Sequence, residues 1–203
     1  MIVSDLMLDL DVFQGTLADL EAFVGADPNP NPSPTPTASP SPTPGGSGNL
    51  IVNGGFEGSL AGWTLGGSQM PLDSVVHYHS GRNSLRVGAN SLPGQTEPGG
   101  DSFAYQTVTI PAGASSAVLD FWYYAYSTDS ITYDWQDAQV QDGSGNLLLD
   151  VFHMCSDGQV WTEQSVDLSA YAGQTLRIYF NAHGDGYTDP TTMWIDDVSL
   201  MVN

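Results

Sequence analysis

Aromatic side chains alternate with aliphatic ones in several stretches of the C-terminal half of the chain. In 117–126, Leu119, Phe121 and Tyr123 occupy every second position, and further rings fill the positions between them. Successive side chains of a β-strand point to opposite faces, so one set is expected to be buried and the other to face outward. The same division of 103–110, 133–141 and 174–182 completes an outward set: Tyr105, Trp122, Tyr124, Tyr126, Trp135, Gln139, Arg177, Tyr179 and Asn181.

These outward residues combine flat rings with hydrogen-bonding groups. A pyranose ring has an apolar face that packs on Trp and Tyr, and its hydroxyls pair with amide, carboxylate and guanidinium groups. If the stretches share one sheet surface, they predict a binding face for an uncharged sugar. The alternative is that loops cover these rings, since aromatic residues are favoured in strands whatever their function. We expect the remaining tryptophans, Trp63, Trp161 and Trp194, to pack in the core.

Other groups point less clearly to a reaction. His77 and His79 have the spacing of two metal ligands on one strand face, but no third ligand accompanies them. Cys155 lies two residues from His153, without a group that would orient the pair for nucleophilic attack. The sequence has no Gly-x-Ser-x-Gly, phosphate-loop or Cys-x-x-Cys motif. We therefore expect no catalytic residues in this part of the chain.

The charge of the chain limits its partners. The 203 residues include 23 Asp and Glu against three Arg and Lys together, which gives a formal net charge of −20. Such a chain repels phosphate backbones and anionic lipid, so nucleic acid and acidic membranes are not expected partners. No apolar stretch is long enough to span a bilayer. The single Cys155 excludes an intrachain disulfide.

Three regions differ in pattern. Residues 49–203 alternate short runs of Val, Ile, Thr, Tyr and Trp with turns that contain Gly, Pro and Asp. This pattern predicts an all-β, antiparallel jelly-roll β-sandwich, with strands that include 50–57, 74–78 and 117–126 and a tight hairpin at 142–145. Residues 27–48 carry Pro at nearly every second position, which predicts a semi-rigid Pro/Thr-rich linker that ends in a flexible Gly/Ser joint. Linkers of this kind are typical of secreted modular proteins.

Residues 1–26 have the periodicity of a helix. Their apolar residues recur every three or four positions: Val3, Leu6, Leu10, Phe13, Leu17, Leu20 and Val24. The spacing predicts a short amphipathic helix, which cannot bury its apolar stripe alone. We expect it to end an upstream domain, with oligomerisation through residues 3–24 as the alternative. The start of the chain lacks the features of a signal peptide, so we expect the tail of a longer, secreted protein.

Several motifs occur together in the third region. Asn-Leu-Ile-Val-Asn-Gly-Gly-Phe-Glu at 49–57 is followed by Gly-Trp-Thr at 62–64, and Trp-Ile-Asp-Asp-Val-Ser-Leu occupies 194–200. With these motifs the region resembles the jelly-roll carbohydrate-binding modules of families 4, 9, 16 and 22. It is equally similar to the MAM-like accessory β-sandwich domains of secreted bacterial peptidases.

The resemblance implies a structural Ca²⁺ ion. In such modules a Glu of the opening motif and an Asp near the end commonly bind calcium, and these map to Glu57 and to Asp196 or Asp197. Asn83 and the carbonyls of the turn 80–83 are expected to supply further oxygen ligands. The alternative is that these side chains are surface carboxylates and strand caps. A second, weaker candidate cluster is Asp129, Asp185 and Asp189.

We therefore expect a non-catalytic accessory module of a secreted protein. It would bind a glycan or polysaccharide and tether an upstream enzyme domain to glycan surfaces. The alternative is a structural or protein-interaction domain of a secreted peptidase or of a cell-surface assembly.

Overall fold

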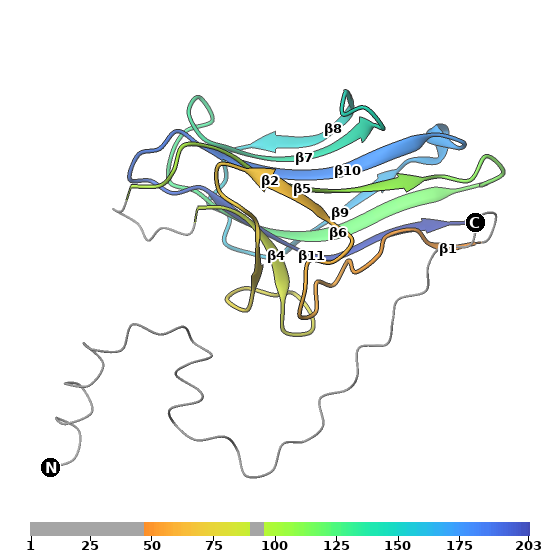
Figure 1. Cartoon of the computed structure of the whole chain (residues 1–203), viewed down its shortest axis with the longest axis horizontal. Coiled ribbons are helices and arrows are strands. Elements are labelled where there is room, and N and C mark those ends of the chain that lie inside the picture. Colours follow the sequence, from red (N-terminus) through yellow and green to blue (C-terminus); the bar gives the residue numbers. More distant parts are fainter. Residues whose placement is uncertain (1–46, 90–95) are drawn as a thin grey trace, which may run out of the picture. The chain divides into compact units, whose positions relative to one another are not determined.

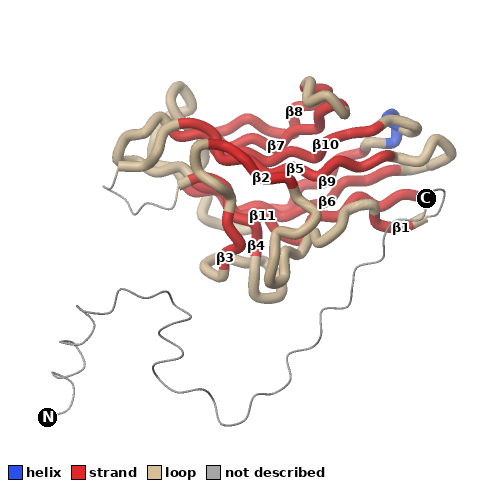
Figure 2. The backbone as a smooth tube through the Cα atoms, in the orientation of Figure 1, coloured by secondary structure: helices blue, strands red, loops and turns tan. Residues whose placement is uncertain are grey.

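The computed structural model describes residues 47–89 and 96–203, which form two antiparallel β-sheets packed face to face (Figures 1 and 2). The predictions for residues 1–26 and for most of the linker lie outside the described residues. The predicted all-β jelly-roll sandwich is confirmed. Within the described residues, no helix has the length and apolar character needed to cross a membrane.

The first layer, called the β6 sheet, has the strand order β3-β4-β11-β6-β9, with β1 paired to β11. Its strands are β1 (Gly48–Asn49), β3 (Leu72–Ser74), β4 (Ser84–Gly88), β6 (Ala117–Tyr126), β9 (Thr162–Asp167) and β11 (Thr192–Val202). Of the strands that the structure describes, the first and the last, β1 and β11, are neighbours.

The second layer, called the β10 sheet, has the order β2-β5-β10-β7-β8. Its strands are β2 (Thr64–Gly67), β5 (Gly100–Thr109), β7 (Trp135–Asp142), β8 (Leu147–Met154) and β10 (Thr175–Gly184). A short 3-10 helix, η1 (Ser169–Tyr171), precedes β10. In Figure 1 the strands β7, β8 and β10 lie along the upper layer, and β4, β6 and β11 lie along the lower one.

The predicted hairpin at 142–145 joins β7 to β8. The Asp142 carboxylate accepts hydrogen bonds from the backbone N–H groups of Ser144, at 2.8 Å, and Asn146, at 2.9 Å. Gly145 takes a positive φ of 96°, which a residue with a side chain rarely adopts. The turn therefore depends on Asp142 and Gly145.

The predicted strand at 50–57 was wrong. Asn53 and Phe56 have φ angles of 53° and 54°, in the left-handed region that a strand does not use. Gly54 lies against β11 so closely that a Cβ atom there would be 1.9 Å from the carbonyl oxygen of Val198. This segment is therefore a turn fixed by contacts with β11. The predicted strand at 74–78 also differs, because β3 ends at Ser74 and a loop follows.

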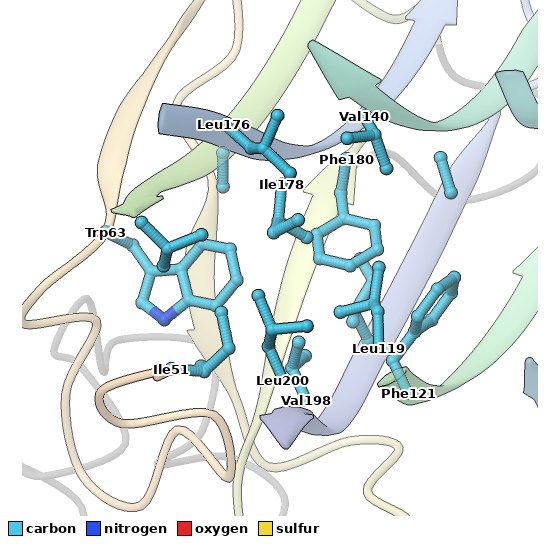
Figure 3. Close-up of a cluster of buried hydrophobic side chains, with 14 of the residues drawn as sticks. Ile51, Trp63, Leu119, Phe121, Val140, Leu176, Ile178, Phe180, Val198 and Leu200 are labelled. Atoms are coloured by element: carbon cyan, nitrogen blue, oxygen red, sulfur yellow. The ribbon is translucent and has the colours of Figure 1, made fainter. Parts of the chain in front are cut away.

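The core lies between the two sheets (Figure 3). Leu119 and Phe121 of β6 meet Ile178 and Phe180 of β10, and the Phe121 and Phe180 rings make an edge contact with centroids 5.0 Å apart. Trp63 packs in this core, as predicted, with 7% of its surface exposed. Burying each of these large side chains contributes roughly 1.5–3 kcal/mol to folding. The inward positions of both strands are those that the alternation assigned.

Candidate functional site

The fold divides the nine predicted binding residues between two opposite surfaces. Trp122, Tyr124 and Tyr126 lie on β6, which pairs with β9 and β11. The other six lie on β5, β7 and β10, which belong to the second sheet. The condition that all these stretches share one sheet surface is therefore not met. Alternation along a strand identifies its outward face, but it does not say which sheet the strand joins.

The outer surface of the second sheet, called the β10 face, brings six predicted residues together. In β10, Tyr179 lies directly opposite Tyr105 of β5 and Gln139 of β7. The neighbouring outward positions of β10 are Arg177 and Asn181. The face consists of outward residues of β5, β7, β8 and β10: Asp101, Phe103, Tyr105, Trp135, Asp137, Gln139, Gln141, Asp150, His153, Arg177, Tyr179, Asn181 and His183.

A layer of rings covers the β5 side of this face. The Phe103 ring lies 5.6 Å from Tyr179 and 6.4 Å from Tyr105, both in near-parallel orientation. The Arg177 guanidinium lies over Tyr105, with its Cζ atom 4.8 Å from the ring centroid. Gly66 of β2 makes room for this layer, because a Cβ there would lie 2.4 Å from the Phe103 ring.

A hydrogen-bonded chain of five side chains links four strands beside these rings. The Asn181 Nδ2 group lies 3.2 Å from both Asp101 Oδ1 and Asp137 Oδ2, so it donates to the two carboxylates. His183 pairs with Asp101 at 2.8 Å, and His153 pairs with Asp137 at 2.6 Å. Asn181 and Asp137 are only 3% and 4% exposed. The network therefore holds the polar groups of the face in fixed positions.

Trp135 lies between the two histidines at one end of the face. Its ring stacks on His183 at a centroid distance of 3.9 Å and an interplanar angle of 2°, and His153 approaches it at 5.6 Å. Each imidazole is held by its own carboxylate. The indole is thereby fixed, with one ring face covered by His183.

The environment of Tyr179 keeps its hydroxyl neutral. Burial raises the pKa of the phenol well above its ordinary value, and the nearby charges of Asp101 and Asp137 raise the pKa further. A neutral phenol both donates and accepts hydrogen bonds, which suits contact with a sugar hydroxyl.

The outer surface of the β6 sheet carries the other three predicted residues. The loop between β3 and β4 lies over this surface and places two imidazoles on the rings. His79 stacks on Trp122 at 3.9 Å, and His77 stacks on Tyr124 at 4.4 Å. For Trp122 and Tyr124, the alternative that a loop covers the rings is therefore what the structure shows. The two histidines pack on rings; they do not point to a shared metal.

Trp161 and Trp194 also belong to this outer surface, not to the core between the sheets as predicted. Tyr124 meets Trp161 at 5.8 Å and Trp194 at 5.6 Å, both edge-on. Trp194 is buried, with 8% exposed, and its indole N–H donates to Ser74 Oγ at 3.1 Å. These rings reach burial through the covering loop, which strand alternation does not reveal.

The predicted calcium ligands gather around the turn 79–83. Glu57 Oε1 accepts hydrogen bonds from the backbone N–H groups of Arg82, at 2.9 Å, and Asn83, at 3.2 Å. A Cβ at Gly81 would lie 1.8 Å from Glu57 Oε1, so the carboxylate fits only because that position is glycine. The Asn83 side chain points to Asp73, to whose carboxylate it donates at 2.6 Å.

The Asp pair at 196–197 holds the same turn. Asp196 Oδ2 accepts the backbone N–H groups of His79, at 2.8 Å, and Ser80, at 3.1 Å. Asp196 is fully buried, and burial raises its pKa to about 6. The two oxygens of Asp197 pair with His79 Nδ1 and Ser80 Oγ, both at 2.7 Å. The arrangement accounts for these carboxylates as anchors of the loop.

The weaker of the two predicted clusters is the one whose oxygens converge. Asp129, Asp185 and Asp189 each offer a carboxylate oxygen, and these oxygens all lie within 4.8 Å of one another. Within residues 47–89 and 96–203, this is the acidic group that could hold a metal ion. All three are half-buried, and oxygen ligands suit a hard cation.

Two further acids lie behind this cluster. Asp134 accepts the backbone N–H of Asp185 at 2.8 Å and the hydroxyl of Thr191 at 2.6 Å. Glu97 accepts the backbone N–H of Thr191 at 3.3 Å. Burial, together with the charges of the neighbouring acids, raises the pKa of both carboxyls, that of Glu97 to about 7. The repulsion among these groups is the kind that a bound cation relieves.

Some residues of the β10 face were missing from the predicted set. Phe103 follows from the same alternation that gave Tyr105, two residues along β5. His183 and Asp101 lie beyond the predicted strand ends, since β10 extends to Gly184 and β5 begins at Gly100. His153 was considered only as a neighbour of Cys155. Longer strand assignments would have found His183 and Asp101, whereas Phe103 and His153 lie in stretches already assigned as strands.

The chain matches no protein-family model and no curated protein sequence. Among solved structures, the fold is similar to the module TmCBM61 in complex with β-1,4-galactotriose, with a TM-score of 0.54, 17% identity, and coverage of 77% of this chain and 100% of that one. The CBM22-1 xylan-binding domain from Paenibacillus barcinonensis Xyn10C gives a TM-score of 0.50 at 15% identity, over 77% of this chain and 95% of that domain.

The K3 cleaved adhesin domain of Lys-gingipain from Porphyromonas gingivalis gives a TM-score of 0.53 at 12% identity, with 76% and 99% covered. At such low identity a structural match shows the fold and leaves the ligand open. The described residues thus share the jelly-roll β-sandwich fold of carbohydrate-binding modules.

Proposed function

We propose that residues 49–203 are a non-catalytic carbohydrate-binding module whose β10 face binds a glycan. The observation that carries the proposal is the layer of Phe103, Tyr105 and Tyr179, next to a fixed network of amide and carboxylate groups. Rings of this kind pack on the apolar face of a sugar, and the polar groups take its hydroxyls. Side chains that are held in place before binding lose little entropy when a ligand arrives.

The opposite surface supports a second candidate function, protein interaction. The segment around β3 and the following loop exposes large apolar side chains: Met70, Leu72, Val75, Val76 and Tyr78. Exposed apolar groups that lie together are typical of contact sites between proteins. This observation favours the interaction domain of a secreted peptidase or surface assembly as the alternative.

The two faces provide a matched pair of variants for the test. The full 203-residue chain is applied to immobilised polysaccharides, including β-1,4-galactan and xylan, which the structurally similar modules suggest as probes. We expect retention of the wild type, loss of retention in Tyr179→Ala, and unchanged retention in Trp122→Ala. The melting temperature of each variant shows that it is folded.

The opposite pattern, with binding lost only in Trp122→Ala, would place the site on the β6 sheet and refute the β10 face. A folded chain that no polysaccharide retains would refute glycan binding and leave the protein-interaction alternative.

We also propose that the acidic cluster of Asp129, Asp185 and Asp189 binds Ca²⁺. Three converging carboxylates suit this ion, which takes six to eight oxygen ligands. Glu57, Asn83, Asp196 and Asp197 are the second candidate location, which the resemblance implies. Calorimetric titration of the chain with CaCl₂ separates the two: Asp189→Asn abolishes binding at the first location, and Asp197→Asn abolishes it at the second.

The proposed setting is a secreted protein in which the linker 27–48 joins the module to an upstream enzyme. Tethering of this kind raises the local concentration of the substrate. Detection of the native polypeptide in the extracellular fraction, at a mass well above that of 203 residues, would support it. Self-association through residues 3–24 is the alternative role of the first region, and its signature is a drop to monomer mass when these residues are deleted.

A further inference from the structure

We infer that the β10 face selects glycans by charge, binding amine-bearing chains more tightly than uncharged ones and rejecting chains that carry carboxylates. This inference rests on the proposed function of the face and names the class of glycan it takes. It follows from which charges on the face are open to a ligand and which are already engaged.

Two carboxylates of the face retain open oxygens. Asp150 lies opposite Gln139 at the β8 edge and is exposed, and its carboxylate accepts no hydrogen bond within the described part of the chain. The Asp101 side chain is 49% exposed, and both of its hydrogen bonds, from Asn181 and His183, go to Oδ1. Its Oδ2 atom is therefore open to a donor from a ligand. Asp101 precedes Phe103 on β5, and Asp150 lies on β8, two strands from Tyr179.

The one permanent positive charge of the face, that of Arg177, is held against a ring and a backbone carbonyl of the protein. The Arg177 guanidinium packs over the Tyr105 ring at 4.8 Å and donates to the carbonyl oxygen of Gly143 at 2.9 Å. A Cβ at Gly145 would lie 2.7 Å from Arg177 Nη1, so the guanidinium fits closely against the β7–β8 hairpin. Arg177 therefore holds Tyr105 and the hairpin in place, and it is not presented as a receptor for a ligand carboxylate.

The histidines do not restore a positive surface. His153 and His183 each direct Nδ1 to a carboxylate of the face, Asp137 and Asp101, so both imidazoles are paired within the face. A uronate would meet Asp101 and Asp150 without a free cation to pair with. A protonated amine would instead form charge-assisted hydrogen bonds with the same oxygens and lie near the faces of the rings.

One polysaccharide in three charge states tests the ranking. β-1,4-Galactan is used unmodified, with its C6 hydroxyls oxidised to carboxylates, and with the same hydroxyls replaced by amines. Affinity electrophoresis of the full chain should rank the aminated form first and the oxidised form last. The differences should shrink as salt is added, because exposed charges are screened over about 10 Å at 0.1 M salt.

Single charge removals then locate the effect. Asp150→Asn should raise the affinity for the oxidised galactan by about two- to fivefold, the size expected for one exposed charge pair. Glu163→Gln is the matched control: it removes one charge from an exposed residue opposite Trp122, on the other sheet. We expect no change in that variant.

Three results are distinguishable. If the chain binds the unmodified galactan, or another uncharged hexosan treated in the same way, but does not follow the predicted order of affinities, the inference is overturned. The proposed function then still stands. An equal gain in Asp150→Asn and Glu163→Gln also overturns it, since the total charge of the chain would then explain the selectivity. Failure to bind any form overturns the proposed function as well.

Discussion

Glu97 provides a sharp test of the electrostatics at the acidic end of the sandwich. Its side chain is 4% exposed, its carboxylate lies where a Cβ at Gly184 would be only 1.9 Å away, and it accepts the Thr191 N–H at 3.3 Å. Burial and the charges of Asp134 and Asp185 raise its pKa from 4.5 to about 7. Replacement by Gln keeps the shape and the acceptor and removes the charge.

The direction in which folding stability changes with pH follows from proton binding. The folded state holds a proton on Glu97 at pH values where the unfolded chain has lost it, so folding stability falls as pH rises from 4.5 to about 7 and stays lower above that range. The full pKa difference corresponds to about 3 kcal/mol at most. Solvent near the site reduces this figure, and we expect the charge to cost the wild type about 1–2 kcal/mol at pH 8.

Urea unfolding followed by tryptophan fluorescence, in EDTA at pH 5 and pH 8, measures the effect. Glu97→Gln should equal the wild type at pH 5 and exceed its stability by about 1–2 kcal/mol at pH 8. Glu163→Gln, an exposed carboxylate on β9, serves as the control and should show no such pH-dependent gain. A difference between Glu97→Gln and wild type that is the same at both pH values would refute the reasoning.

Three further outcomes are expected. Phe180→Ala should destabilise the fold by about 3–5 kcal/mol in urea unfolding, because it leaves a cavity against Phe121 and Trp63; a loss below 1 kcal/mol would show that this core collapses around the gap. Gly66→Ala should displace the Phe103 ring and weaken glycan retention at a temperature where the variant is still folded. Gly113→Ala, with open space at its Cβ, is the control and should leave retention unaltered. Adding CaCl₂ should raise the melting temperature of the wild type but not of Asp189→Asn, and an equal rise in both would remove the cluster from consideration.

Strand alternation predicted the two faces of each strand well. Phe121 and Phe180 point into the core, and Trp122 and Tyr179 point away from it, as the sequence indicated. The period of two is a local property of an extended backbone, so it can be followed without knowledge of the fold. The hairpin at Asp142 is equally local and was equally predictable.

Pairing between distant strands could not be predicted in the same way. Trp122 and Tyr179 have similar surroundings in the sequence, yet β6 and β10 belong to opposite sheets. A jelly roll distributes successive strands between its layers, and local patterns carry no record of that choice. The stacking of His77 on Tyr124 likewise depends on a loop whose path is set by Glu57 and Asp196, far away in the chain.

The acidic cluster shows a related limit. Asp129 and Asp185 meet only because β7 and β10 are neighbours, so their sequence positions gave no reason to prefer them. Glu57 and Asp196 were preferred because a family pattern marked them. In the structure their oxygens accept backbone N–H groups of one turn. Holding this turn is a role for carboxylates that needs no metal.

The acidic cluster and the β10 face share the same strand ends. Asp134 immediately precedes Trp135 at the start of β7, and Asp185 follows β10 two residues after His183. The backbone N–H of Asp185 donates to Asp134, so this contact ties together the ends of the two strands whose side chains form the Trp135–His183 stack. A cation that neutralises Asp129, Asp185 and Asp189 would lower the repulsion that works against that contact. Metal binding should therefore order one end of the β10 face, and EDTA should reduce glycan affinity in the wild type more than in Asp189→Asn.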